Sequence, residues 1–185
     1  MEKWPNLKWR HLAVILGFIL VENLSVAPAL ASSVSIDDLF FPTLILGDEA
    51  NLDPAYEDKD KTHSPCIKID YPGATKGAGN IEGYSTVIWR YPKDNLGEFK
   101  GRDLKGAIRL LFWARSDKTM KNVKFSIGAF KEDSDYIPIN VTLNSTWRQF
   151  EIPLLLKNLT DIRAGFACKL AENGAVYLNR ISYEI

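Results

Sequence analysis

The chain is dominated by short segments in which apolar and polar residues alternate, each bounded by turn-forming Pro, Gly, Asn, Asp or Ser. Alternation with a period of two is typical of strands with one buried side and one solvent-facing side. The segments predicted to be strands are 66–71, 84–91, 108–115, 123–130, 137–143, 147–152, 162–170 and 176–183. The sequence shows no long amphipathic helical period, and only 154–159 is compatible with one turn of helix.

About eight strands without intervening helices predict an all-β fold, an antiparallel β-sandwich, most simply a jelly roll. The chain of 185 residues is long enough for one ordinary domain. We expect residues 61–185 to form the sandwich domain. Residues 32–60 are predicted to be an irregular acidic N-terminal segment packed on it, with one short strand inside 40–46.

The first 31 residues have the pattern of a secretory signal peptide. Basic residues (Lys3, Lys8 and Arg10) precede an apolar run at 12–20, which is shorter than the roughly 20 residues that span a bilayer. The small residues Ala29 and Ala31 then suit cleavage after Ala31. We therefore expect a secreted or periplasmic protein with no membrane span after cleavage; an uncleaved anchor is the alternative.

The charge balance and the cysteines set two further limits. With 23 basic and 23 acidic residues, the chain lacks the basic excess that favours nucleic acid or an anionic membrane as the main partner. Export would permit a disulfide between Cys66 and Cys168. Strand phase puts Cys66 on the side opposite Ile67 and Ile69, and Cys168 on the inward side with Phe166. A bridge and two separate thiols both remain open.

The stretch 84–115 combines aromatic and hydrogen-bonding side chains on two predicted strands and their connection. Sugars bind such surfaces because their C–H faces stack on rings while polar side chains bond their hydroxyls. The rings expected to contact a sugar are Tyr84, Trp89, Tyr91 and Trp113, and the expected hydrogen-bonding residues are Arg90, Asn95, Arg109 and Arg115. Alternatively, a ring on this face lies under a long loop and belongs to the core. Trp147 is expected to plug one end of the sandwich.

Catalytic patterns are sparse. His63 is the sole histidine after residue 31, and the chain contains no GxSxG, HExxH, CxxC or Walker motif. The carboxylates between Asp48 and Asp70 have no recognisable catalytic spacing, which favours a protein that is not an enzyme over a small glycoside hydrolase. The same acidic stretch supplies oxygen ligands of the kind that Ca²⁺ prefers, with Asp48 as a candidate.

Three blocks of the sequence resemble exported bacterial carbohydrate-binding-module-like domains with a galactose-binding-like jelly roll. They are LGDEANLD with HSPCIKIDY (46–71), the aromatic strands with DLKGAIRLLFWARSD (83–117), and TWRQFEIPL with GFACKL and VYLNRISYEI (146–185). The resemblance covers most of the chain after residue 31. It implies a non-catalytic exported protein that binds a polysaccharide or glycan, with any enzyme on a separate chain. An envelope or assembly protein that uses the sandwich for protein contacts is the alternative.

The sequence departs from this family at three places. Leu96 stands where the family has Trp in an Asn-Trp-Gly turn, and Tyr84 stands where the family often has Trp. Asn179-Arg180 replaces an Asp-Asp pair in the closing strand, where an acid in related modules helps to hold a structural Ca²⁺. Asn179 would still offer one carbonyl oxygen, so Asp48 and Asn179 are the expected ligands if calcium is bound.

Overall fold

The computed structural model describes residues 32–73, 83–128 and 136–185. The predicted signal peptide lies outside these residues and stays a prediction. The described residues form eleven strands and two short 3₁₀ turns, η1 (Ile36–Asp38) and η2 (Lys61–His63). The strands are β1 (Ser33–Ser35), β2 (Phe41–Gly47), β3 (Asn51–Tyr56), β4 (Cys66–Tyr71), β5 (Ser85–Arg90), β6 (Arg109–Ser116), β7 (Met120–Ile127), β8 (Ile137–Leu143), β9 (Arg148–Pro153), β10 (Ala164–Leu170) and β11 (Gly174–Glu184). None of the described residues belongs to a helix long and apolar enough to cross a membrane.

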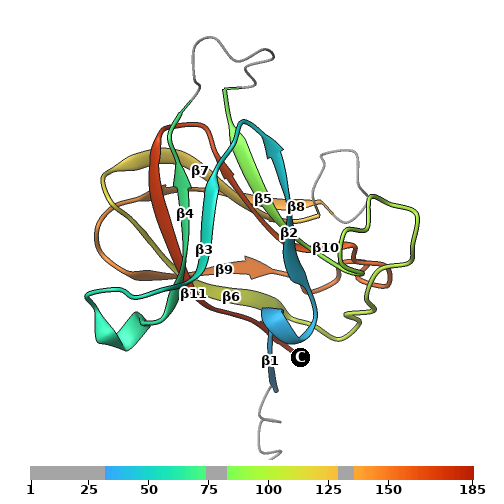
Figure 1. Ribbon diagram of the computed structural model, residues 1–185. Helices are drawn as coiled ribbons and strands as arrows, with labels where there is room; N and C mark the ends of the chain where they lie inside the picture. The colour runs from blue at the N-terminus through green and yellow to red at the C-terminus, as the bar shows by residue number, and fades with distance from the viewer. Residues whose placement is uncertain (1–31, 74–82, 129–135) are drawn as a thin grey trace, which may run out of the picture. The chain divides into compact units, whose positions relative to one another are not determined.

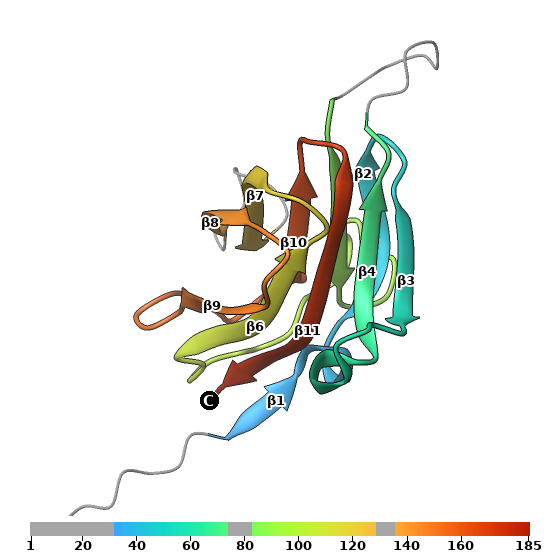
Figure 2. The same cartoon turned by 90° about the vertical axis from the view of Figure 1, so that its left-hand side faces the viewer.

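The strands make two antiparallel sheets that pack face to face (Figure 1). Sheet A has the order β3-β4-β11-β6-β9, and β1 pairs with the end of β11. Sheet B has the order β2-β5-β10-β7-β8. Figure 2 shows the strands of sheet A side by side, with β11 between β6 and β4. The predicted antiparallel sandwich is confirmed.

The core lies between the sheets because one side of each strand is apolar. In β6, Leu110, Phe112 and Ala114 are fully buried, and the Phe112 ring meets the rings of Phe125 (4.7 Å between centroids) and Phe166 (5.2 Å) from sheet B. The strand phases predicted for β6, β7 and β10 are confirmed by these contacts. Each fully buried ring of this kind contributes on the order of 2 kcal/mol to folding.

The segment 32–60 differs from its prediction. β2 matches the short strand expected inside 40–46, but β1 and β3 were not predicted, and β2 and β3 are edge strands of the two sheets. The sequence of β3, NLDPAY, hides its strand character because Pro54 and the polar residues suit an edge that has one free side. The predicted helical turn at 154–159 is also wrong, since this segment contains a turn at 155–156 and no helix.

The two cysteines are separate, buried thiols. Cys66 lies on the outer face of sheet A with Tyr56, Tyr177 and Trp147, whereas Cys168 belongs to the core between the sheets. The structure thus selects two thiols over a bridge.

Candidate functional site

The outer face of sheet A carries three of the predicted site residues. Arg109, Trp113 and Arg115 occupy alternate positions of β6 and therefore point away from the core. Trp113 is half-buried and pairs with Gln149 of β9 on one side and Asn179 of β11 on the other. Three neighbouring strands thus contribute to this face, with β6 between β9 and β11 (Figure 2).

Arg115 has a structural role in place of the predicted ligand contact. Its Nε and Nη2 atoms donate hydrogen bonds to Oδ2 of Asp58, at 3.1 and 2.7 Å, and its guanidinium lies 3.7 Å from the centre of the Tyr177 ring. The side chains of Arg115 and Asp58 are only 15% and 4% exposed. Burial raises the pKa of Asp58, but the hydrogen bonds from Arg115 and from backbone N–H groups outweigh it, so the net pKa is lowered.

The loop between β3 and β4 covers the part of this face around Trp113 and Trp147. The ring of His63 lies 4.5 Å from that of Trp147, stacked at 15°, and 4.8 Å from that of Trp113. The side-chain amide of Asn179, on β11, holds this loop against the sheet. It donates hydrogen bonds to the carbonyls of His63 (3.2 Å) and Pro65 (2.8 Å). The placement predicted for Trp147, at an end of the sandwich, is wrong. Because Arg148 pairs with Ala114, Trp147 falls beside Arg115 on the outer face.

An open hollow of about 410 Å³ lies on the same face. It is lined by Arg109, Leu111, Gln149, Phe150, Glu151 and Glu184. Leu111 is two residues before Trp113 on the same side of β6, so the indole and the hollow are neighbours. Arg109 donates from Nε to Glu184 (2.7 Å) and from Nη1 to Glu151 (3.3 Å). The bond to Glu184 raises the pKa of Arg109, so this cation is fixed between two carboxylates.

Sequence reasoning missed Gln149, Glu151 and Glu184 as candidates. Gln149 and Glu151 alternate within 147–152, and Glu184 directly follows the predicted strand 176–183 in the same alternation, which would have assigned all three to outward faces. What the sequence lacked was the strand order that sets β6 between β9 and β11, because these strands are far apart along the chain.

The other five predicted ligand residues belong to β5 and its flanking segments. Trp89 is fully buried, with its ring edge against Phe166 at 5.2 Å, so its predicted stacking role is wrong. The reason is that β5 lies between β2 and β10 of sheet B, with Trp89 on the core side. Arg90 is 4% exposed and donates to the carbonyl of Asn95. Tyr84 is half-buried with Nζ of Lys169 3.4 Å from its ring centre.

Asn95 and Tyr91 shape the loop that follows β5. The Asn95 side chain is buried and bonds four backbone groups: the carbonyls of Tyr91 and Phe99 and the N–H groups of Gly97 and Phe99. The Tyr91 ring lies 3.7 Å below the guanidinium of Arg102. These residues do not join Trp113, because they belong to sheet B and its loop.

Asp48 and Asn179 are too far apart to share one calcium ion. Oδ2 of Asp48 accepts hydrogen bonds from the hydroxyl of Tyr71 (2.7 Å) and the N–H of Gly83 (3.1 Å). Tyr71 pairs with Gly174 at one end of the β4–β11 ladder, whereas Asn179 follows Leu178 at the other end. Five residues of extended strand separate the ends, roughly 16 Å. The described residues also contain no group of three or more His, Cys, Asp or Glu placed to hold a metal.

No protein-family model matches the chain, and no curated protein sequence matches it. Among solved structures, the chain is similar to the family 11 carbohydrate-binding module of a cellulosomal cellulase of Clostridium thermocellum. The identity is 15%, with 84% of this chain and 96% of that chain covered, at a TM-score of 0.52. At this identity the likeness shows the fold alone, a jelly-roll β-sandwich like that of this module.

Two further modules align over similar lengths. The family 30 module of another Clostridium thermocellum cellulase is 14% identical, covers 85% of this chain and 92% of its own, and has a TM-score of 0.47. A family 29 module of Piromyces equi is 11% identical over 84% and 91% of the two chains, with a TM-score of 0.45.

Proposed function

We propose that this chain is a non-catalytic, exported carbohydrate-binding protein that holds its ligand on the outer face of sheet A. The observation that carries the proposal is the half-buried indole of Trp113 beside a hollow lined by Arg109, Gln149, Glu151 and Glu184. An indole face suits the C–H side of a sugar ring, and these polar side chains offer donors and acceptors to hydroxyls.

The electrostatics of the hollow favour a neutral glycan. One guanidinium and two carboxylates line it, which gives a local formal charge of one negative. An anionic polysaccharide would therefore meet net repulsion. Because Arg109 is already held by Glu151 and Glu184, it loses little further freedom when a ligand binds. The hollow is open, so we expect modest affinity.

A glycoside hydrolase is less well supported by the same residues. Glycoside hydrolysis needs two carboxyl groups, one of which stays protonated to act as an acid. Glu151 and Glu184 both accept hydrogen bonds from Arg109, an arrangement suited to charged carboxylates.

Affinity electrophoresis against soluble neutral and anionic polysaccharides, followed by calorimetry on any positive, tests the proposal. We expect Trp113→Ala to weaken binding at least about tenfold, because it removes the stacking surface. Gln149→Ala tests the same face with an exposed side chain that bears little on folding. Circular dichroism confirms that each variant is folded.

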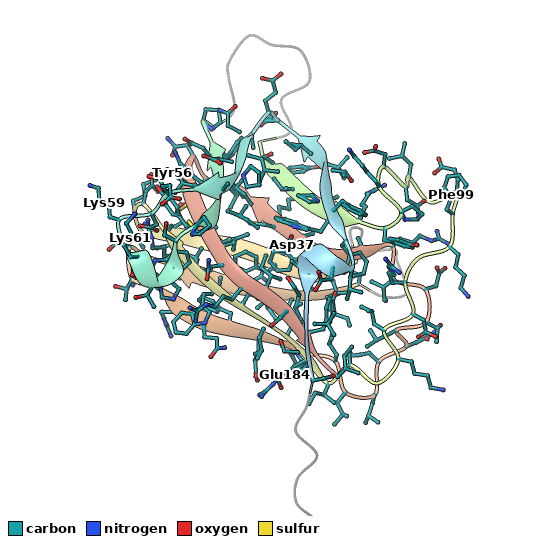
Figure 3. The ribbon with its side chains drawn as sticks, turned by 60° about the horizontal axis from the view of Figure 1, so that its bottom comes forward. Asp37, Tyr56, Lys59, Lys61, Phe99 and Glu184 are labelled. Atoms are coloured by element: carbon teal, nitrogen blue, oxygen red, sulfur yellow. The ribbon has the colours of Figure 1, made fainter. Side chains whose placement is uncertain are left out.

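Phe99→Ala is the matched control, since this ring is 63% exposed on the loop after β5 and lies apart from Glu184 of the hollow (Figure 3). Retardation by no polysaccharide, or unchanged binding in both folded Trp113→Ala and Gln149→Ala, would overturn the assignment. Loss of binding in Phe99→Ala alone would move the site to that loop.

A further inference from the structure

The turn after β9 exposes two leucines in an unfavourable setting. Leu155 and Leu156 are 66% and 97% exposed, and the N–H of Lys157 donates to the carbonyl of Leu154 at 3.0 Å, which closes the turn around them. Leu156 has a φ of 65°, the left-handed region that favours glycine or asparagine. A bulky apolar residue thus occupies a backbone conformation that a glycine or an asparagine adopts at lower cost. Such a position is a reason to look for function.

Two more exposed apolar side chains adjoin this turn. The N–H of Leu154 donates to the carbonyl of Ile108, and the N–H of Ile108 donates to the carbonyl of Glu184, so the ends of β9, β6 and β11 meet here. Ile108 and Ile185 are 40% and 41% exposed. We call Ile108, Leu155, Leu156 and Ile185 the leucine tip.

The border of the leucine tip carries basic side chains. Lys105 and Lys157 are exposed and, with Leu155 and Leu156, line a hollow of about 260 Å³ formed by residues 105–108 and 154–160. Two acids lie in the adjoining segments: the carboxylate of Asp103 accepts the N–H of Lys105, and Asp161, which follows Thr160, is paired with Arg163 at 3.1 Å. Long basic side chains beside exposed leucines match a lipid interface, where the stems lie along apolar surface and the ammonium groups reach headgroups.

The described part of the chain begins at the same edge of the domain. Ser32 and Ile185 exchange backbone hydrogen bonds of 2.9 Å in both directions. β1 pairs with the last residues of β11 (Figure 2). Ser32, the first described residue, therefore lies beside Ile185, and the apolar residues 12–20 precede it in the sequence. If that run is the uncleaved anchor, the alternative to a signal peptide, its covalent link to Ser32 keeps this edge of the domain near a membrane.

We propose that the leucine tip inserts into the interface of a phospholipid bilayer, with Lys105 and Lys157 at the headgroups. Burial of the leucines in the acyl boundary is the main contribution, because the chain as a whole has no net charge. Anionic lipid strengthens the contact through the two lysines. This contact is independent of the proposed glycan site.

An environment-sensitive fluorophore on the full chain tests the proposal. Leu156→Cys provides the attachment point, and labelling of the folded protein is selective because Cys66 and Cys168 are buried. Phe99→Cys is the control, because Phe99 is another exposed apolar residue, 63% accessible, on the loop after β5. With vesicles of phosphatidylcholine and phosphatidylglycerol, we expect a blue shift for the probe at position 156 and none at position 99.

Charge reversal gives the second measurement. In the Leu156→Cys chain, Lys105→Glu with Lys157→Glu is expected to raise the lipid concentration for half-maximal shift on the order of tenfold. No shift at position 156, or equal shifts at both positions, would overturn the proposal. So would a shift at position 156 that appears without vesicles as protein concentration rises, together with a dimer in sedimentation, because the leucine tip would then be a contact between copies.

Discussion

The ion pair between Arg115 and Asp58 ties the loop after β3 to the outer face of sheet A. Both groups are nearly enclosed, and the guanidinium also lies against the rings of Tyr177 and Trp147. When one partner of such a pair is removed, the other is left as an uncompensated buried charge. Removing one partner therefore lowers the free energy of unfolding by more than the intact pair adds to it, compared with a pair of apolar residues.

We predict that Asp58→Asn lowers the free energy of unfolding by about 3 kcal/mol at neutral pH, measured by urea titration. Because the pKa of Asp58 in the folded protein is below its ordinary 3.8, the unfolded chain takes up the proton first as pH falls. The contribution is complete above about pH 5 and is lost as pH falls through 3.8 toward the folded pKa. The difference between wild type and variant should shrink over that range.

Asp70→Asn is the control for this prediction. Asp70 lies on the same outer face, but its partner in the pair is Lys68 and its side chain is 45% exposed. An exposed pair contributes about 1 kcal/mol or less. Equal losses in the two variants, or a gap that widens in acid, would contradict the role given to Asp58.

At the scale of elements, the loop after β5 is organised by one side chain. In this loop, residues 91–99 belong to no strand. The side chain of Asn95 instead makes hydrogen bonds to four backbone groups between Tyr91 and Phe99. The loop can then present Leu96 and Phe99 to solvent while its own backbone stays satisfied.

Asn95→Ala is expected to destabilise the protein by about 2 kcal/mol, because it leaves buried backbone groups unpaired. Amide hydrogen exchange at Gly97 and Phe99 should accelerate, since both N–H groups lose their acceptor. Asn158→Ala is the control, because Asn158 is exposed and its side-chain carbonyl accepts from the N–H and the hydroxyl of its neighbour Thr160. Unchanged exchange at Gly97 in Asn95→Ala would refute this role, and glycan binding should be unaffected.

At the scale of the whole molecule, the sandwich separates groups that the sequence alone cannot separate. Cys66 lies on the outer face of sheet A. Cys168 lies on sheet B and points into the core between the two sheets. A disulfide needs the two Cβ atoms about 4 Å apart and directed toward each other. Opposite faces of a layer do not allow that geometry.

We therefore predict two free thiols that are silent in the folded state. Burial, followed by the charge of Asp58, raises the pKa of Cys66 to about 11, and burial also raises the pKa of Cys168. Ellman's reagent should detect no thiol in native protein and two after unfolding without reductant. A protein that yields none after unfolding would contain the bridge.

Much of the fold followed from the sequence by itself. Strand type and the inward side of each strand depend on alternation within a few residues, and β4 and β8 have the predicted bounds. The edge strand β3 escaped prediction because an edge tolerates Pro54 and polar residues.

The site depended on tertiary structure. Alternation along β6 put Arg109, Trp113 and Arg115 on one face, and this placement is confirmed. Whether that face is open, and which residues share it, depends on strand order and on the loop between β3 and β4. These place Glu184 and Gln149 around the hollow and His63 against Trp113, all from distant parts of the chain. Local residue patterns specify which side of a strand is buried, but contacts between distant segments form only when the whole sandwich packs, and those contacts decided that Trp89 is core and that Trp113 borders a hollow.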